Sequence, residues 1–158
     1  MTAEQEKLML LTIEVARKGM EQGHGGPFGC VIVKDGTIIA TGHNQVLLEQ
    51  DPTAHAEVVA IREACRKLGS FQLTGCELYT SCEPCPMCLG AIYWARPSRV
   101  FYAASKEDAS AAGFDDSFIY QEIRLPFSDR SIPFEAARPA GYLEVFQAWK
   151  DMEGKILY

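Results

Sequence analysis

Apolar residues in the first third of the chain recur with two different periods. Over residues 4–20 they recur every three or four positions, which predicts an amphipathic helix. Two runs rich in β-branched residues follow, over residues 28–34 and 37–41, and each predicts a strand. Asp35 and Gly36 stand between the two runs, and an Asp-Gly pair favours a tight hairpin turn.

The middle of the chain contains a second helical pattern. Residues 42–51 are polar and predict a loop, after which Pro52 and Gly69 mark the expected ends of a helix. Apolar side chains step by three, four and three residues along one face: Val58, Ile61, Cys65 and Leu68. The remaining predicted elements are strands at 76–80 and 99–103 and helices at 87–95, 117–123 and 143–152. This order of elements predicts an α/β fold with a mixed sheet and helices on both faces.

Composition restricts the class of protein. The 158 residues are 47% hydrophobic and 23% charged, which is typical of one folded domain and excludes a disordered chain. No apolar run approaches the length of a membrane span, and Glu4 and Glu6 stand where a signal peptide would be basic. We therefore expect a cytoplasmic protein without a membrane partner. The net charge of −6 counts against a nucleic-acid partner.

Cysteine placement indicates metal or redox chemistry. Three of the six cysteines, Cys82, Cys85 and Cys88, fall within seven residues. A disulfide scaffold is more typical of small secreted domains, so we expect free thiols in a reducing compartment. Cys30 and Cys65 are expected to be small core residues.

His55 and Glu57 combine with Cys85 and Cys88 into the H-x-E and P-C-x-x-C pattern of zinc-dependent nucleobase deaminases. A catalytic zinc takes three protein ligands and leaves a fourth place for water. His55, Cys85 and Cys88 supply those three ligands. Glu57 is the expected general acid and base, which takes a proton from water and delivers protons to the ring and the leaving amine.

Each of these residues also has an ordinary structural interpretation. Cys76 and Cys82 could join Cys85 and Cys88 in a closed all-thiolate zinc site, which would leave His55 and Glu57 without a role. A lone C-x-x-C could serve redox chemistry, and a lone acidic residue in a first turn usually complements the helix dipole. His24 and His43 are expected in loops, as ordinary solvated residues.

Beyond these motifs, nearly the whole chain resembles the bacterial guanine deaminase branch of the cytidine and deoxycytidylate deaminase zinc superfamily. The stretches that carry the resemblance are GGPFG (25–29), VIVKDG (31–36), DPTAHAE (51–57), YTSCEPCPMCLGAIYWARP (79–97), AGFDDSFIY (112–120) and FQAW (146–149). The zinc motif alone does not choose between purine and pyrimidine deaminases. The FDDSFIY stretch and the terminal Tyr158 favour guanine.

The resemblance implies a fold and an assembly. The fold is a three-layer α/β/α cytidine deaminase-like domain over residues 1–158, with a five-stranded mixed sheet. The assembly is a homodimer in which the segment at 140–158 crosses to close the partner's pocket. Three prolines and a glycine between the last two predicted helices would make an extended connector: Pro126, Pro133, Pro139 and Gly141.

The resemblance also implies an activity, the hydrolysis of guanine to xanthine and ammonia with Zn²⁺ as cofactor. Asn44 would bind the purine edge, Phe28 would pack on the base, and Asp116 would hold the amino group and help to move protons. The other implied substrate-binding residues are Ala56, Trp94 and Tyr158. From sequence alone, Trp94 suits the core better than the pocket, and Asp115 and Asp116 before Ser117 are typical of a helix N-cap.

Two other classes of function remain open at this point. One is a deaminase that acts on guanosine, cytosine, adenine or a tRNA adenosine, and the other is a zinc-binding module without activity. A panel of these substrates, followed by ammonia release, separates them.

Overall fold

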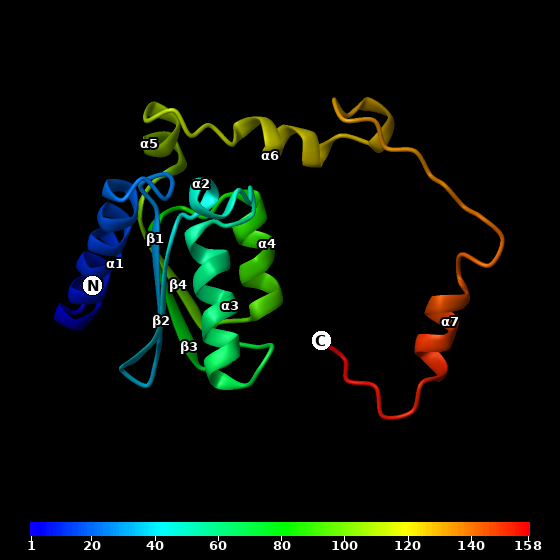
Figure 1. The fold of residues 1–158 in the computed structure, drawn as a ribbon, viewed down its shortest axis with the longest axis horizontal. Coiled ribbons are helices and arrows are strands. Elements are labelled where there is room, and N and C mark those ends of the chain that lie inside the picture. Colours follow the sequence, from blue (N-terminus) through cyan, green and yellow to red (C-terminus); the bar gives the residue numbers. More distant parts are fainter. The chain divides into compact units, whose positions relative to one another are not determined.

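A mixed four-stranded sheet with the order β2-β1-β3-β4 organises the first part of the chain (Figure 1). β1 (Gly29–Lys34) pairs antiparallel with β2 (Thr37–His43) and with β3 (Cys76–Cys82), and β3 pairs parallel with β4 (Arg99–Ala104). The expectation of five strands is wrong by one. The chain leaves β4 at Ser105, whose side chain caps a helix, and no further strand joins the sheet.

Helices cover both faces of this sheet, as expected for three α/β/α layers (Figure 1). The helices up to residue 111 are α1 (Ala3–Glu21), α2 (Val46–Glu49), α3 (Ala56–Leu68), α4 (Pro86–Ala95) and α5 (Lys106–Ala111). Along β1, Cys30 and Ile32 pack with α3 and α4, whereas Val31 and Val33 pack with α1. Because both faces of β1 are apolar and covered, its residues are buried almost without exception.

The hairpin and the end of α3 follow the sequence prediction. Asp35 and Gly36 both have positive φ, 48° and 74°, as a type I′ turn requires. Gly69 ends α3 in the left-handed conformation, with φ 60°.

The start of α3 differs from the prediction. Asp51 accepts hydrogen bonds from the backbone N–H and the hydroxyl of Thr53, and its carbonyl accepts from the N–H of Ala54. These bonds close a turn, so the helix begins at Ala56 and not at Pro52. His55 consequently becomes an extended N-cap residue rather than part of the first turn. The short helices α2 and α5 were not predicted either.

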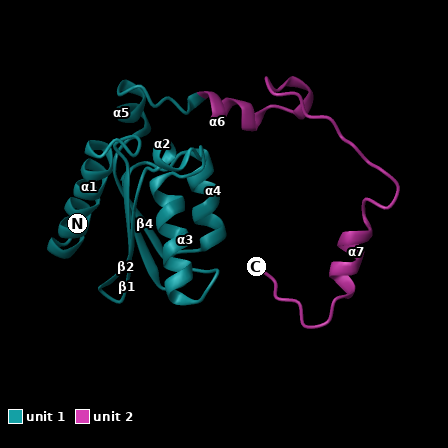
Figure 2. Ribbon diagram, in the orientation of Figure 1, with its two compact units in different colours: residues 1–117 teal, residues 118–158 magenta.

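The computed structural model describes all residues 1–158 and divides them into two compact units, residues 1–117 and 118–158 (Figure 2). The second unit contains most of α6 (Ser117–Arg124), a short 3-10 helix η1 (Phe127–Asp129) and α7 (Glu144–Asp151). None of its residues is buried. None of the helices of the chain is both long and apolar enough to span a bilayer. Two expectations stay predictions: that residues 1–158 form one deaminase domain, and that residues 140–158 cross to a partner chain.

Candidate metal centre and substrate cavity

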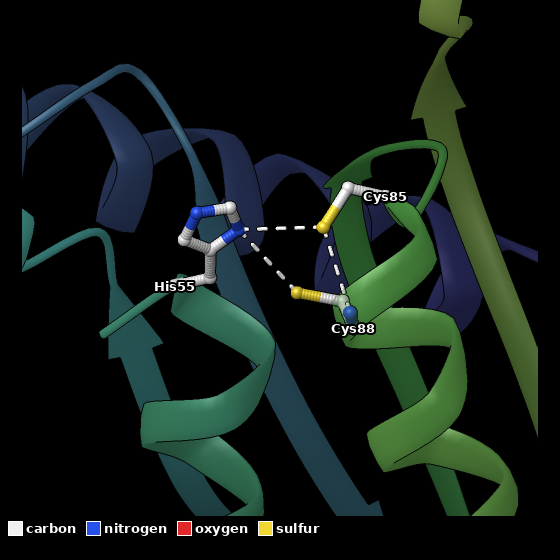
Figure 3. Close-up of side chains that lie close together, drawn as sticks. All are labelled: His55, Cys85 and Cys88. Atoms are coloured by element: carbon white, nitrogen blue, oxygen red, sulfur yellow. Dashed lines mark hydrogen bonds between the residues drawn. The ribbon is translucent and has the colours of Figure 1, made fainter. Parts of the chain in front are cut away.

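Two helix starts bring the three predicted metal ligands together. His55 is the N-cap residue of α3, Cys85 is the N-cap residue of α4, and Cys88 lies in the first turn of α4. Figure 3 shows their side chains pointing toward one another. The Nδ1 atom of His55 lies 3.5 Å from the Sγ atoms of both cysteines. All three ligand atoms lie within 4.8 Å of one another.

These distances fit a tetrahedral zinc ion. Bond lengths of about 2.0 Å to nitrogen and 2.3 Å to sulfur put neighbouring N and S ligand atoms about 3.5 Å apart in a tetrahedral site. The observed separations between His55 and the two cysteines are 3.5 Å. One imidazole and two thiolates are the ligand types that zinc prefers, and three ligands leave one position for water. The separations of His55 from the two cysteines are therefore already those of a zinc site.

The two predicted thiol ligands differ in their acidity. Interactions with Cys88 and His55 lower the pKa of Cys85 to about 4, whereas the pKa of Cys88 is raised by Cys85 and by burial. The backbone N–H of Cys88 also points at the Cys85 sulfur, 3.5 Å away. Thiolates at a helix N-terminus are further favoured by the helix dipole.

Glu57 lies next to this ligand set and is nearly excluded from solvent, with 6% of its surface exposed. Its Oε1 accepts from the hydroxyl of Thr80 at 2.9 Å, and its Oε2 accepts from the Cys88 thiol at 3.3 Å. Burial raises the pKa of Glu57 above its ordinary value. A carboxyl group with a raised pKa suits proton transfer near neutral pH.

Thr80 was not identified from the sequence. It is 1% exposed and pairs with Cys30 on the central strand, in otherwise apolar surroundings. A polar residue on a buried strand position is a signal for such a partner, because a buried hydroxyl needs a hydrogen bond.

A cavity of about 580 Å³ opens beside the ligand set. Its walls include three residues implied by the family resemblance, Phe28, Asn44 and Asp116, together with His55 and Glu57. A volume of this size is in the usual range for small-molecule sites. The structure therefore brings Phe28, Asn44 and Asp116 to the same cavity as His55 and Glu57.

Asn44 is 6% exposed, and two hydrogen bonds set its position. Its backbone N–H donates to the carbonyl of Phe28 at 3.0 Å, and its Oδ1 accepts from the N–H of Val46 at 3.2 Å. These contacts fix the plane of the amide at the cavity wall. Phe28 in turn meets the edge of Phe114, with ring centroids 4.9 Å apart. Phe114 also lines the cavity, and the sequence did not single it out.

Two neighbouring aspartates divide the roles that the sequence left open. Asp115 caps the helix that follows, because its Oδ1 accepts from the N–H of Ser117 at 2.9 Å. Asp116 lines the cavity, and burial, helped by the charge of Cys85, raises its pKa. The capping interpretation thus belongs to Asp115, which leaves Asp116 available to a ligand.

The remaining predicted binding residues do not line the cavity. Ala56 is fully buried in the core between α3 and the sheet. Trp94 is 64% exposed on α4, so it is not a core residue either. Tyr158 belongs to the unit at residues 118–158. Their roles in substrate binding stay predictions.

The other cysteines lie outside the ligand set. The Cys82 thiol donates to the carbonyl of Ser105 at 3.4 Å, and burial raises its pKa to about 11. Cys76 is buried at the opposite end of β3. The geometry therefore favours the His55 ligand set over a closed all-thiolate site.

Comparisons with known proteins agree with this site. Residues 2–104 match the family described as the cytidine and deoxycytidylate deaminase zinc-binding region. The guanine deaminase of Bacillus subtilis (strain 168) is 58% identical over 153 residues, which cover 97% of this chain and 98% of that protein. An X-ray structure of guanine deaminase from Bacillus subtilis superimposes with a TM-score of 0.95 at 57% identity, covering 100% of this chain and 99% of that one.

A more distant relative matches a smaller part of the chain. The tRNA-specific adenosine deaminase of Aquifex aeolicus is 44% identical over 99 residues, which cover 63% of this chain and 65% of that protein. The likeness to deaminases of another substrate class is thus confined to part of the chain.

Proposed function

The chain belongs to the cytidine and deoxycytidylate deaminase zinc-binding family, and we propose that it hydrolyses guanine to xanthine and ammonia. One observation carries the proposal. A buried carboxylate, Glu57, lies beside a three-ligand zinc set in a cavity whose walls also carry Asn44 and Asp116. The likeness to a guanine deaminase extends over 97% of the chain, whereas the likeness to a tRNA deaminase covers 63%.

The reaction replaces the amino group on C2 of guanine by oxygen. Zinc held by His55, Cys85 and Cys88 would supply a water of lowered pKa. A bond forms between the water oxygen and C2, and the bond between C2 and the amino nitrogen breaks. Glu57 accepts a first proton from the water at its carboxylate and passes it to the ring nitrogen next to C2. It then takes the proton of the new C2 hydroxyl and gives it to the amino nitrogen, which departs as ammonia while C2 becomes a carbonyl.

The other cavity residues bind and orient the base. The Asn44 Oδ1 is held by the N–H of Val46, so its NH₂ group points to the ligand side as a donor. Phe28 and Phe114 supply an apolar wall for the flat ring system. Asp116 accepts hydrogen bonds from the amino group or the neighbouring ring N–H. These contacts match guanine, which presents acceptors and donors along one edge.

The chain acts as a homodimer in this proposal. No residue of the 118–158 unit is buried, although it carries many large apolar side chains. Exposed apolar area of this extent is typical of a surface that contacts another protein, and a second copy of the chain is the expected partner. We place the enzyme in the cytoplasm, because a zinc site needs Cys85 and Cys88 as reduced thiols and all six cysteines are free.

A substrate panel tests the activity. The purified zinc-loaded protein is incubated with guanine, guanosine, adenine, cytosine, an ammeline-like triazine and a tRNA anticodon stem-loop, and ammonia release is measured. Each buried polar group left unpaired costs about 1–3 kcal/mol, so kcat/KM for guanine should exceed that for adenine by at least about 100-fold. Comparable kcat/KM values for the two bases, or deamination of the stem-loop alone, would overturn the proposal.

A further inference from the structure

Two histidines that the sequence analysis regarded as solvated loop residues form a pair near the cavity. His24 Nδ1 and His43 Nε2 lie 2.8 Å apart and form a hydrogen bond, in which one ring nitrogen donates to the other. The ring centroids are 5.1 Å apart and both residues are half-buried. Neither residue is a zinc ligand or lines the cavity. The pair therefore has no part in the chemistry described so far.

His43 connects the pair to Asn44. It is the last residue of β2, where it pairs with Gly29 of β1, and Asn44 follows it directly. The N–H of Asn44 then donates to the carbonyl of Phe28. A restraint on the His43 ring thus acts on the backbone that carries the amide into the cavity.

His24 connects the pair to the other side of the same amide. Its carbonyl accepts from the N–H groups of Leu47 at 3.0 Å and Leu48 at 3.1 Å, so it holds the start of α2. The first residue of α2 is Val46, whose N–H donates to the Asn44 Oδ1. The two histidines therefore hold both of the segments that fix the Asn44 amide.

Glycines on both sides leave no space for this arrangement to shift. A Cβ atom at Gly19 of α1 would lie 2.4 Å from the His43 ring. A Cβ atom at Gly25, next to His24, would lie 2.0 Å from the Asn44 Oδ1. Contacts this close are possible only because both positions are glycine. The loop that carries His24 is thus pressed against Asn44, and His43 is pressed against α1.

We propose that the His24–His43 hydrogen bond is a positioning device that holds Asn44 ready to bind the purine edge. Burial, together with the charge of His24, lowers the pKa of His43, which keeps this ring neutral and the hydrogen bond available. The inference rests on the proposed function, because it needs Asn44 to contact the base. Both histidines are positioning residues and neither touches the substrate.

The test removes the hydrogen bond and then restores it. His24→Leu deletes the ring nitrogen, whereas His24→Asn returns a polar side-chain atom near the position of Nδ1. Net hydrogen-bond energies predict that His24→Leu raises KM for guanine by about 3- to 10-fold. The kcat value should change less than about twofold, since Glu57 and the zinc ligands are untouched, and His24→Asn should restore KM to within about twofold.

Binding is measured separately from turnover in a Glu57→Gln background. The probe is 8-azaguanine, an analogue of guanine. Calorimetry should show that His24→Leu raises its Kd by the same factor by which it raises KM for guanine. With Asn44→Ala added, His24→Leu should have no further effect on Kd, because the pair acts through Asn44. Gln22→Leu, an exposed change in the same loop, is the matched control and should leave Kd unchanged.

The outcomes separate this inference from the proposed function. A parent chain that neither deaminates guanine nor binds 8-azaguanine removes both. If the parent is active but His24→Leu leaves its affinity unchanged, this inference alone is overturned. The same holds if His24→Leu lowers the affinity equally in chains with Asn44 and with Asn44→Ala. If His24→Leu fails to fold, judged by Tm and zinc content, His43→Leu and the amide variant His43→Gln give the same comparison from the other ring. The inference is supported if His43→Leu loses affinity and His43→Gln restores it. It is overturned if the affinities of His43→Leu and His43→Gln are equal.

Discussion

Residues 1–117 bury their apolar side chains within one unit, whereas residues 118–158 bury none. In the first unit Ile32, Leu73 and Leu78 are fully buried around the central sheet. In the second, Val145 and Phe146 are 68% and 64% exposed. The first unit thus has a core of its own and contains the whole cavity. The second has apolar side chains but no core to place them in.

The short helices of the second unit also lack the packing that would stabilise them. α6 and α7 have eight residues each, and isolated helices of that length are marginal in water. Their stability must come from packing against another surface. The difference between the units teaches that the possible metal ligands and the whole cavity lining come from the part of the chain that builds a core, whereas residues 118–158 build none.

The largest effect should come from a change inside the first unit. Glu57→Gln removes the proton carrier but keeps the shape of the side chain. We expect a loss of kcat of at least about 10³-fold, since Glu57 serves more than one proton transfer and each is worth roughly 10²–10⁴-fold. Zinc content and Tm should stay near those of the parent. Near-normal turnover would show that the first unit does not use this residue as its base.

Zinc retention tests the ligand set with two matched cysteine variants. Cys85→Ser should lower zinc affinity by more than about 100-fold. Mutating a residue that only hydrogen-bonds to a metal ligand already lowers metal affinity by about 10–100-fold, and Cys85 is itself a predicted ligand. Cys82→Ser should keep about one zinc per chain, since its thiol hydrogen-bonds to Ser105 instead. The measurement is the metal content of the purified variants. An empty site in Cys82→Ser would contradict the ligand assignment.

Core substitutions sharpen the comparison in terms of stability. Leu78→Ala in the first unit should lower the free energy of unfolding by about 2–5 kcal/mol, because it leaves a cavity in a packed core. Phe146→Ala in the second unit should change the unfolding of residues 1–117 little but weaken self-association. Urea denaturation and sedimentation measure the two quantities. Equal losses of unfolding free energy would show that both units belong to one core.

A smaller effect is expected from the end of the second unit. Deleting Ile156 to Tyr158 leaves every zinc ligand in place, so the variant should fold and hold zinc. If the tail closes a cavity, kcat/KM should fall by about 10- to 100-fold, as it does when substrate is held less well. Full activity of the truncated chain would remove the tail from catalysis.

Mixing the weakly active truncated chain with an inactive full-length chain then tests whose cavity the tail covers. The truncated chain is combined with a full-length Glu57→Gln chain under conditions that allow subunit exchange. If tails cross between chains, the mixed dimer has one site with both Glu57 and a tail, and activity returns. If each tail serves its own chain, no site has both, and the mixture stays at the low activity of the truncated chain despite exchange.

The sequence alone singled out the three residues that the structure brings together as a possible metal site. His55, Cys85 and Cys88 lie at helix starts, where the backbone directions are set locally by the turn before each helix. The strands and long helices were likewise predictable, because burial on one or both faces imposes a period that is visible in the sequence. The start of α3 was misplaced, since Pro52 is compatible with a helix start and the hydrogen bonds of Asp51 decide otherwise.

Only the tertiary structure decided which distant residues meet these local motifs. Thr80 reaches Glu57 from the neighbouring strand, Phe114 meets Phe28, and His24 meets His43. It also separated Cys82 from the ligand set and left the sheet with four strands. Such contacts depend on strand order, register and the space that glycines leave, and none of these leaves a periodic signal along the chain. The sequence therefore determined which chemistry is present, and the packing of the sheet and its helices decided which residues support it.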